Sequence, residues 1–271
     1  MHRVWAVLLL AYVPVLYWTL RFVWVSQWTM PHTAHTAHTA HANHANHANH
    51  TVHQILIPYG PTPPLWTACA RTWTPRWRRK QWDADMCRHA IMEAMPHRRE
   101  LLDYEGVMFT DVCRSAIMYT EGGVYADMDI CATPKTTLPD CDACFVHTSM
   151  GVSTDMMLAR RHHPVFLNIL HQYADARWVT DVWLWTPYIR TMFSTGPAKL
   201  TLAIHKYPEV RVIEYPNVQH IRGNTWHGWD VVVFVAVWRY GWIVGCLFLV
   251  SKRYNLGRVL RKCGRRKGMP V

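Results

Sequence analysis

Residues 122–129 of the chain read Gly122-Gly123-Val124-Tyr125-Ala126-Asp127-Met128-Asp129, which is the strongest local signal in the sequence. The apolar residues after the two glycines predict a strand over 124–130. Because side chains alternate along a strand, Asp127 and Asp129 are expected on one side and Met128 on the other. Two such carboxylates at a strand end can hold a hard divalent cation through oxygen. The alternative is ordinary surface charge, which a bare Asp-x-Asp often represents.

The sequence around this stretch alternates between strand and helix patterns. Strands are expected over 52–57, 77–82, 124–130 and 209–214, and helices over 65–72, 85–95, 109–120, 165–173 and 198–205. Pro96 ends the second of these helices, and Gly122-Gly123 closes the third. Strands and helices that interleave in this way predict an α/β layer fold.

Asp111 and Arg114 come just before the glycines, three residues apart on a predicted helix, so they share a face of it. Alone, the pair reads as a helix salt bridge. Because the pair precedes the Asp127 strand, a second role is expected, in which Arg114 binds a phosphate and Asp111 binds a sugar hydroxyl.

The net charge of +11 comes entirely from the two ends of the chain. Residues 51–230 contain 18 basic and 18 acidic residues, so this stretch is neutral. The excess cations are Arg3, Arg21, Arg239 and the eight basic residues after position 250, all beside apolar stretches. This placement indicates membrane topology signals, so no nucleic-acid partner is expected.

Two apolar stretches are expected to be membrane helices. Residues 1–25 carry an uncharged run over 4–20 and form the predicted N-terminal anchor, for which a cleaved signal peptide is the alternative. Residues 231–250 form the second membrane segment, spanning or embedded, with Arg239 near the middle. The basic tail over 251–271 is expected in the cytosol, which places the residues between the two helices in the lumen.

Residues 26–51 form a histidine-rich linker built on the triplets His-Thr-Ala and His-Ala-Asn. No apolar face recurs in it, so a flexible spacer is expected, with metal binding by its histidines as the alternative. Asn49-His50-Thr51 is an N-glycosylation sequon. The six cysteines between positions 69 and 144 would be lumenal, where disulfides form, although Cys141-x-x-Cys144 could also be half of a zinc site.

The run Asp111-x-x-Arg114-x10-Gly-Gly-Val-Tyr-Ala-Asp-Met-Asp resembles the signature of the Och1-like, or family 32, glycosyltransferases. Further blocks match in order over about residues 52–250, and they resemble the mannosyl-inositol-phosphorylceramide synthase branch of that family. These blocks are Val52-His53-Gln54, Pro64-x-Trp66, Gly151 to Met157, His163-Pro164-x-Phe166, Trp185 to Pro197 and Asn224 to Asp230. The chain departs from the usual pattern at Ile55-Leu56, at Thr110 and Ser115, and at Thr154.

The resemblance implies a single GT-A (Rossmann-like) catalytic domain over 52–230, a Mn²⁺ or Mg²⁺ cofactor and a GDP-mannose-like donor. It implies Asp127, Asp129 and Asp155 as catalytic candidates, with the metal held by Asp129, Asp127 and His227. The donor would be bound by Asp111, Arg114, Gly123, Tyr125 and Trp226. Trp226 as a core residue and His227 as an ordinary polar residue are the alternatives.

The sequence thus predicts a metal-dependent retaining hexosyltransferase that moves mannose from GDP-mannose onto a sphingolipid headgroup such as inositol phosphorylceramide. It is expected to be an integral membrane protein of the endomembrane system, in the Golgi, with its catalytic domain in the lumen. One alternative is a transferase of the same fold acting on glycoprotein glycans or polysaccharide. Another is a non-catalytic membrane protein whose histidine linker binds metal.

Overall fold

The computed structural model describes residues 51–57, 62–148, 151–181, 186–221 and 228–232. Contacts divide the chain into two units, Met1–Thr225 and Trp226–Val271, and all the strands and helices named below belong to the first. The predicted N-terminal anchor, the linker before Thr51, the second membrane segment after Val232, and the residues Trp226 and His227 lie outside the described part. Within the described residues, no helix is both long enough and apolar enough to cross a bilayer.

A six-stranded mixed sheet forms the centre of the first unit, with strand order β2-β1-β3-β6-β5-β7. These strands are β1 (Thr51–Ile55), β2 (Arg78–Trp82), β3 (Gly123–Ala126), β5 (Ala143–Thr148), β6 (Gly151–Ala159) and β7 (Arg211–Ile213). β1 runs parallel to β2 and β3, and β7 runs parallel to β5. β6 is antiparallel to both of its neighbours.

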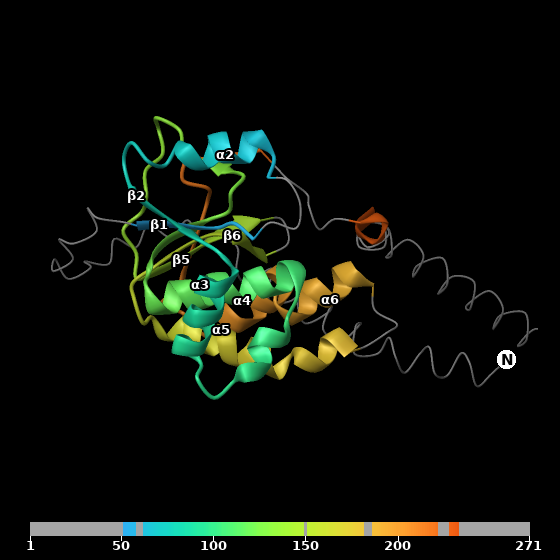
Figure 1. The fold of residues 1–271 in the computed structure, drawn as a ribbon. Coiled ribbons are helices and arrows are strands. Elements are labelled where there is room, and N and C mark those ends of the chain that lie inside the picture. The colour runs from blue at the N-terminus through green and yellow to red at the C-terminus, as the bar shows by residue number, and fades with distance from the viewer. Residues whose placement is uncertain (1–50, 58–61, 149–150, 182–185, 222–227, 233–271) are drawn as a thin grey trace, which may run out of the picture. The chain divides into compact units, whose positions relative to one another are not determined.

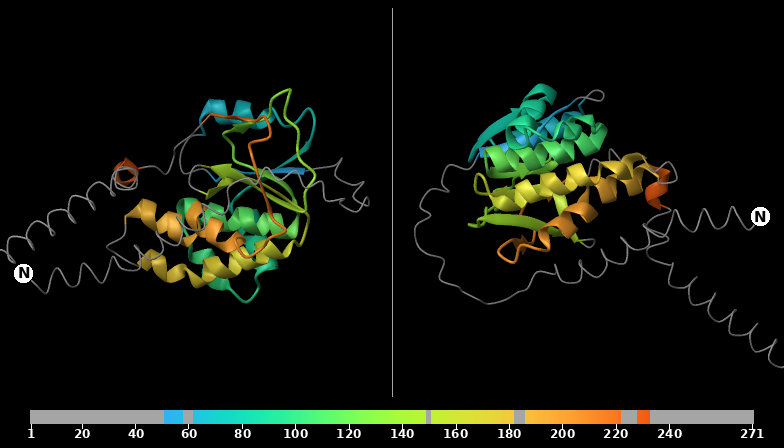
Figure 2. Two further views of the ribbon diagram at one scale, coloured as in Figure 1. Left: turned by 180° about the vertical axis from the view of Figure 1, so that it is seen from behind. Right: turned by 90° about the horizontal axis from the view of Figure 1, so that it is seen from below.

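Helices cover both faces of this sheet (Figures 1 and 2). α2 (Pro64–Arg71) lies on one face. The other face carries α3 (Ala84–Ala94), α4 (Gly106–Thr120), α5 (Pro164–Asp175), α6 (Pro187–Ser194) and α7 (Pro197–Ile204). The short 3-10 helices η2 (Arg99–Asp103) and η3 (Arg177–Asp181) complete this layer. The α/β fold predicted from the sequence is therefore confirmed.

Alternation along the strands fills two separate apolar cores. Val124 and Ala126 of β3 pack into the core on the α2 side, whereas Tyr125 between them packs into the larger core under α4 and α5. Met156 and Met157 of β6 divide in the same way. The sequence did not indicate β6, because the polar residues Ser153, Thr154 and Asp155 interrupt its apolar run, although all nine residues of the strand are buried.

The glycines before β3 allow a close approach that no other residue type permits. Gly122 and Gly123 adopt φ angles of +69° and +86°. A Cβ atom on Gly122 would lie 2.4 Å from the backbone nitrogen of Arg161, and one on Gly123 would lie 2.7 Å from the carbonyl oxygen of Thr51. These glycines therefore let the chain leave α4 and enter the sheet beside β1.

The predicted strand over 124–130 is wrong in one respect that matters for the site. β3 ends at Ala126, and a turn closed by a hydrogen bond from the Ile130 nitrogen to the Asp127 carbonyl (3.0 Å) follows it. The chain then enters β4 (Ile130–Cys131), which pairs antiparallel with β8 (Gln219–His220) in a separate two-stranded sheet. Asp127 and Asp129 therefore lie on a turn and not on a strand, so strand alternation does not set their directions.

Three disulfides join the described cysteines. Cys69–Cys131 ties α2 to β4, Cys87–Cys113 ties α3 to α4, and Cys141–Cys144 closes a short loop before β5. The disulfide interpretation of the cysteines is thus confirmed. The alternative of a zinc half-site at Cys141 and Cys144 is wrong, because both sulfur atoms are bonded to each other.

Candidate active site

The site lies where β3 ends, and its first side chains come from the buried face of α4. Asp111 and Arg114 are 2% and 4% exposed, and the Arg114 Nε atom lies 3.6 Å from Asp111 Oδ1. The Arg114 guanidinium donates from Nη1 to the Thr154 carbonyl at 2.6 Å and lies 3.4 Å from Asp127 Oδ1. Because both pair members are buried beside β3 and β6, the pair is more than a surface salt bridge.

Asp111 is held from a second side. Thr195, which caps the carboxyl end of α6, donates its hydroxyl to Asp111 Oδ2 at 2.9 Å. Burial raises the pKa of Asp111 to about 6, while Arg114 and the hydrogen bond from Thr195 act in the opposite direction. Thr195 was not among the residues predicted for the site, although it belongs to the Trp185 to Pro197 block.

Asp127 is the carboxylate directly after β3, and it is bound by two of its neighbours. Tyr125 donates its hydroxyl to Asp127 Oδ1 at 2.6 Å, and Arg114 contacts the same oxygen. Burial raises the pKa of Asp127, Arg114 opposes this, and the carboxylates of Asp129 and Asp155 add to the rise. Asp127 thus links the α4 pair to the rest of the site.

Asp155 joins the site from β6, next to the end of β3. Its carbonyl accepts the Asp127 backbone N–H at 2.8 Å. Its Oδ2 atom accepts the Tyr215 hydroxyl at 2.5 Å and lies 3.6 Å from His220 Nδ1. Tyr215, in the segment between β7 and β8, had no signal in the sequence that pointed to this role.

Asp129 faces the β8 strand. Its Oδ2 atom lies 3.2 Å from His220 Nε2, and its carbonyl accepts the Ile221 backbone N–H at 3.0 Å. The hydrogen bond with Asp129 raises the pKa of His220, burial opposes it, and Asp155 and Asp127 add to the rise. Asp129 and Asp155 both remain mostly buried, so His220 touches two carboxylates that little water reaches.

Six of the predicted site residues are therefore brought together: Asp111, Arg114, Tyr125, Asp127, Asp129 and Asp155. Gly123 is not with them, because it lies at the amino end of β3 against Thr51 and His53, at the other end of the strand from Asp127. Trp226 and His227 lie outside the described residues. The structure adds Thr195, Tyr215 and His220, which were not predicted for the site.

The described residues contain no group of three or more histidine, cysteine, aspartate or glutamate side chains arranged to hold a metal ion. The available oxygen and nitrogen donors nevertheless fit a cation that is completed by a ligand. Magnesium-like ions are commonly bound by one or two carboxylates, with substrate phosphates filling further positions. One oxygen of Asp155, Oδ1, is buried without a hydrogen-bond partner among the described residues.

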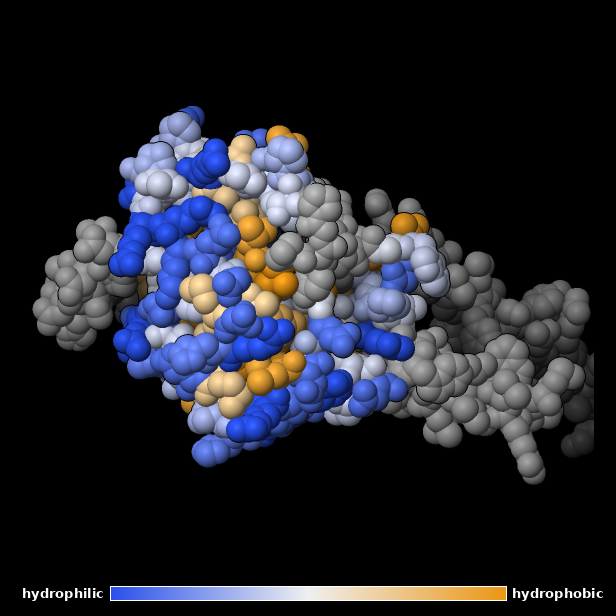
Figure 3. All heavy atoms as spheres, viewed as in Figure 1, coloured by the Kyte–Doolittle hydropathy of each residue, from blue (hydrophilic) through white to orange (hydrophobic). Residues whose placement is uncertain are grey.

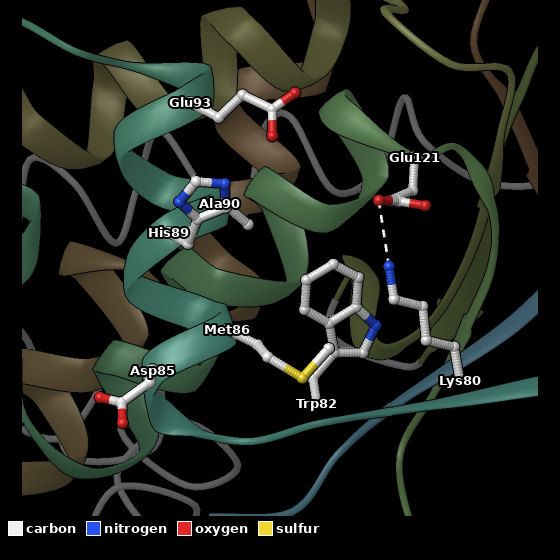
Figure 4. Close-up of a pocket in the computed structure, with 8 residues that line it drawn as sticks. All are labelled: Lys80, Trp82, Asp85, Met86, His89, Ala90, Glu93 and Glu121. Carbon is white, nitrogen blue, oxygen red and sulfur yellow. Dashed lines mark hydrogen bonds and ion pairs between the residues drawn. The ribbon is translucent and has the colours of Figure 1, made fainter.

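A separate cavity of about 430 Å³ lies between β2, α3 and the end of α4 (Figure 4). Trp82 and Met86 lie beside each other there, Lys80 pairs with Glu121 at 3.1 Å, and Asp85, His89 and Glu93 follow one face of α3. None of the predicted site residues lines this cavity. On the face seen in Figure 1, apolar residues show between hydrophilic ones and form no uninterrupted apolar surface (Figure 3).

Among solved structures, the chain is similar to the PaToxG glycosyltransferase (TM-score 0.43, 9% identity, 73% of this chain and 78% of that one). It is also similar to the UDP-bound glycosyltransferase domain of the YGT toxin (TM-score 0.49, 9% identity, 62% of this chain and 80% of that one). No family model matches the chain.

The curated relatives are inositol phosphoceramide mannosyltransferases of Schizosaccharomyces pombe (strain 972 / ATCC 24843). Enzyme 1 is 32% identical over 144 residues, which cover 47% of this chain and 44% of the relative. Enzyme 2 is 30% identical over 133 residues (46% and 36%), and enzyme 3 is 28% identical over 178 residues (57% and 49%). The chain thus spans at most about half the length of these relatives, and the predicted resemblance to this branch is confirmed.

Proposed function

We propose that the chain is a metal-dependent, retaining glycosyltransferase that moves mannose from GDP-mannose onto a sphingolipid headgroup such as inositol phosphorylceramide. The observation that carries the proposal is the convergence of Asp111, Arg114, Asp127 and Asp129 at the end of β3 in a chain similar to three mannosyltransferases of that name. In an α/β sheet, ligands bind beyond the carboxyl ends of strands, where these side chains lie.

In this proposal the residues divide between the two halves of the donor. Arg114, a buried cation, contacts the donor phosphates, and Asp111 accepts a hydrogen bond from a sugar hydroxyl. Asp127, which accepts the Tyr125 hydroxyl and contacts Arg114, contacts the donor sugar or the ribose of the nucleotide. Asp129 is the metal ligand. A divalent cation there would neutralise charge on the departing diphosphate.

Asp155 is proposed to lie on the side of the reacting sugar, because it is the buried carboxylate of β6 next to Asp127. Trp226 and His227 are proposed to close over the diphosphate. We also propose that the chain is an integral membrane protein of the Golgi or a related endomembrane compartment, with this site in the lumen. A lipid acceptor suits a catalytic unit that is tied to the bilayer at its ends.

The test uses membranes that contain the full chain, given labelled GDP-mannose, Mn²⁺ and a lipid extract that includes inositol phosphorylceramide. Wild type is compared with Asp129→Ala and with Asp85→Ala, a control that removes an exposed carboxylate on α3. Labelled lipid is expected from wild type and the control, with at least a hundredfold loss in Asp129→Ala. UDP-sugars are tested in parallel.

Each result has a distinct meaning. Hydrolysis of GDP-mannose without labelled lipid would support a transferase that uses this donor but would exclude a sphingolipid as its acceptor. Activity with a UDP-sugar alone would exclude GDP-mannose as the donor. Equal activity in wild type and Asp129→Ala would overturn the metal-dependent mechanism, and folded wild-type protein with neither hydrolysis nor transfer would overturn the proposal as a whole.

A further inference from the structure

His220 is the feature of the site that the proposed function does not use. It lies on β8, whose partner strand β4 begins directly after Asp129, and its ladder partner is Ile130. The pairing extends beyond the strands to Asp129, whose carbonyl accepts the Ile221 backbone N–H. Two segments about 90 residues apart are thus joined so that this imidazole lies against Asp129.

The two ring nitrogens of His220 face different carboxylates. Nε2 lies 3.2 Å from Asp129 Oδ2, while Nδ1 lies 3.6 Å from Asp155 Oδ2. A histidine that binds a metal commonly offers one nitrogen to the ion and directs the other N–H to a carboxylate, which fixes the tautomer and the orientation of the ring. Asp129, His220 and Asp155 lie in this order, and the 3.6 Å between Nδ1 and Asp155 Oδ2 is slightly longer than a hydrogen bond.

The carboxylate on the far side of the ring is itself held in place. Tyr215 donates its hydroxyl to Asp155 Oδ2, the same oxygen that faces His220. Asp155 is 9% exposed and sits on a strand whose residues are all buried. A fixed, largely dry carboxylate of this kind is suited to orient an imidazole, because little water competes for its oxygen.

The distance between Asp129 and His220 suits an ion that both side chains bind. Two atoms in neighbouring octahedral positions, each about 2.1 Å from a cation, lie about 3 Å apart. The 3.2 Å between Asp129 Oδ2 and His220 Nε2 is close to this separation. Asp127 is placed differently, since Tyr125 and Arg114 both contact its Oδ1 oxygen.

We propose that His220 Nε2 is a ligand of the divalent cation together with Asp129, and that Asp155, held by Tyr215, is the positioning residue that orients the imidazole. This inference rests on the proposed metal-dependent function and names the protein ligands of that same site. Two protein ligands leave the remaining positions to the donor diphosphate and water. An imidazole ligand also favours Mn²⁺ over Mg²⁺, because Mg²⁺ prefers oxygen ligands.

The test measures Mn²⁺ bound to the full chain by electron paramagnetic resonance, with GDP present, and resolves coupling of the manganese to ¹⁴N by pulsed methods. The chain has 18 histidines, many of them in the linker, so a background is needed in which the linker histidines 32–50 are replaced by asparagine. In that background, His220→Ala and His220→Gln are compared with His227→Ala and with His89→Ala, a control that removes an exposed histidine of α3.

The expected result is loss of the imidazole ¹⁴N coupling in both His220 variants, with Mn²⁺ bound at least roughly tenfold more weakly. Coupling is retained in His227→Ala and in His89→Ala. Asp155→Asn keeps the coupling but weakens Mn²⁺ binding, and the preference for Mn²⁺ over Mg²⁺ falls in the His220 variants.

Coupling that survives in the His220 variants, or that disappears in His227→Ala, would overturn the proposed ligand. Such a result leaves the transferase proposal standing if Asp129→Ala still abolishes both Mn²⁺ binding and donor hydrolysis. Absence of specific Mn²⁺ binding in folded wild type would instead overturn the metal site and this inference together.

Discussion

At the scale of single residues, Arg114 organises the site. It contacts the carboxylates of Asp111 and Asp127 and the carbonyl of Thr154, and its side chain is almost fully buried. Burying an isolated charge is very costly. The Arg114 guanidinium and the buried Asp111 carboxylate therefore each depend on the other to remain ionised inside the protein. The same sequence spacing on α3 gives a pair of quite different character, since Arg88 and Asp85 are exposed.

This contrast gives a matched prediction. Arg114→Met should lower the free energy of unfolding by about 3–5 kcal/mol, because it leaves the buried Asp111 carboxylate without its cation and removes the partner of the partly exposed Asp127. Arg88→Met should cost less than about 1 kcal/mol, as expected for an exposed ion pair. Urea unfolding of the two purified variants checks this, and equal losses would show that burial of the Arg114 pair does not matter for stability.

His53 provides a prediction for pH. It is buried in β1, accepts a hydrogen bond from Trp82 Nε1 at 3.0 Å, and its pKa is lowered to about 4, mainly by burial. Between pH 6.5 and about 4 the unfolded chain therefore binds a proton that the folded chain does not, so stability falls as the pH falls through this window. The full contribution is about 3 kcal/mol.

Unfolding measured at several pH values in wild type and in His53→Gln checks this prediction. The variant keeps a polar side chain but has no group that titrates in this range, so its stability should depend less on pH between 6.5 and 4. If the two proteins lose stability in parallel, other titrating groups account for the acid sensitivity.

At the scale of elements, α4 carries Asp111 and Arg114 of the site and is joined to α3 by a disulfide. Cys113 lies between Asp111 and Arg114 in the chain, and its disulfide with Cys87 is fully buried. The bond closes 26 residues, whereas Cys141–Cys144 closes only 3. A longer closed loop restricts the unfolded chain more, which stabilises the folded state relative to it.

Removing each disulfide by paired cysteine-to-alanine substitution should therefore have unequal effects. Loss of Cys87–Cys113 should cost about 3.5 kcal/mol of unfolding free energy, and loss of Cys141–Cys144 about 1.5 kcal/mol, on the chain-entropy account. Thermal unfolding without reductant measures both. The Cys87–Cys113 variant should also bind donor more weakly, because α4 is free to shift, and unchanged donor affinity would argue against this role of the disulfide.

At the scale of the whole molecule, the proposed anchoring at both ends follows from the distribution of charge and apolar residues in the sequence. Residues 51–230 are neutral, whereas the ends combine apolar runs with all of the excess positive charge. A positive tail stays in the cytosol, so the unit that carries the site is proposed to face the lumen, where its disulfides can form.

Membrane fractionation tests this proposal. The full chain should remain in the pellet after alkaline washing and should carry a glycan at Asn49, detected as a shift in mobility that glycosidase removes. Asn49→Gln should lack the shift and stay in the pellet. Release of the chain by the wash would contradict the anchors, and an unglycosylated wild type with a protease-protected tail would contradict the topology.

Sequence patterns predicted the α/β class, the helices α2, α3, α4, α5 and α7, the strands β1, β2, β3 and β7, and a site that includes Asp111, Arg114, Asp127 and Asp129. They could do so because these features are local: a helix places residues three apart on one face, and glycines mark where the chain enters a strand. They also indicated disulfides, but not their pairing, since cysteines far apart in the chain meet only after folding.

The other features depend on the tertiary structure. β6 was not predicted because Ser153, Thr154 and Asp155 interrupt its apolar run, and only the packing on both faces of the sheet buries them. The Asp127–Asp129 turn depends on where β3 stops pairing, and Thr195, Tyr215 and His220 reach the site through contacts that span 60 to 91 positions. Such contacts arise from strand order and helix packing, which no short stretch of sequence encodes.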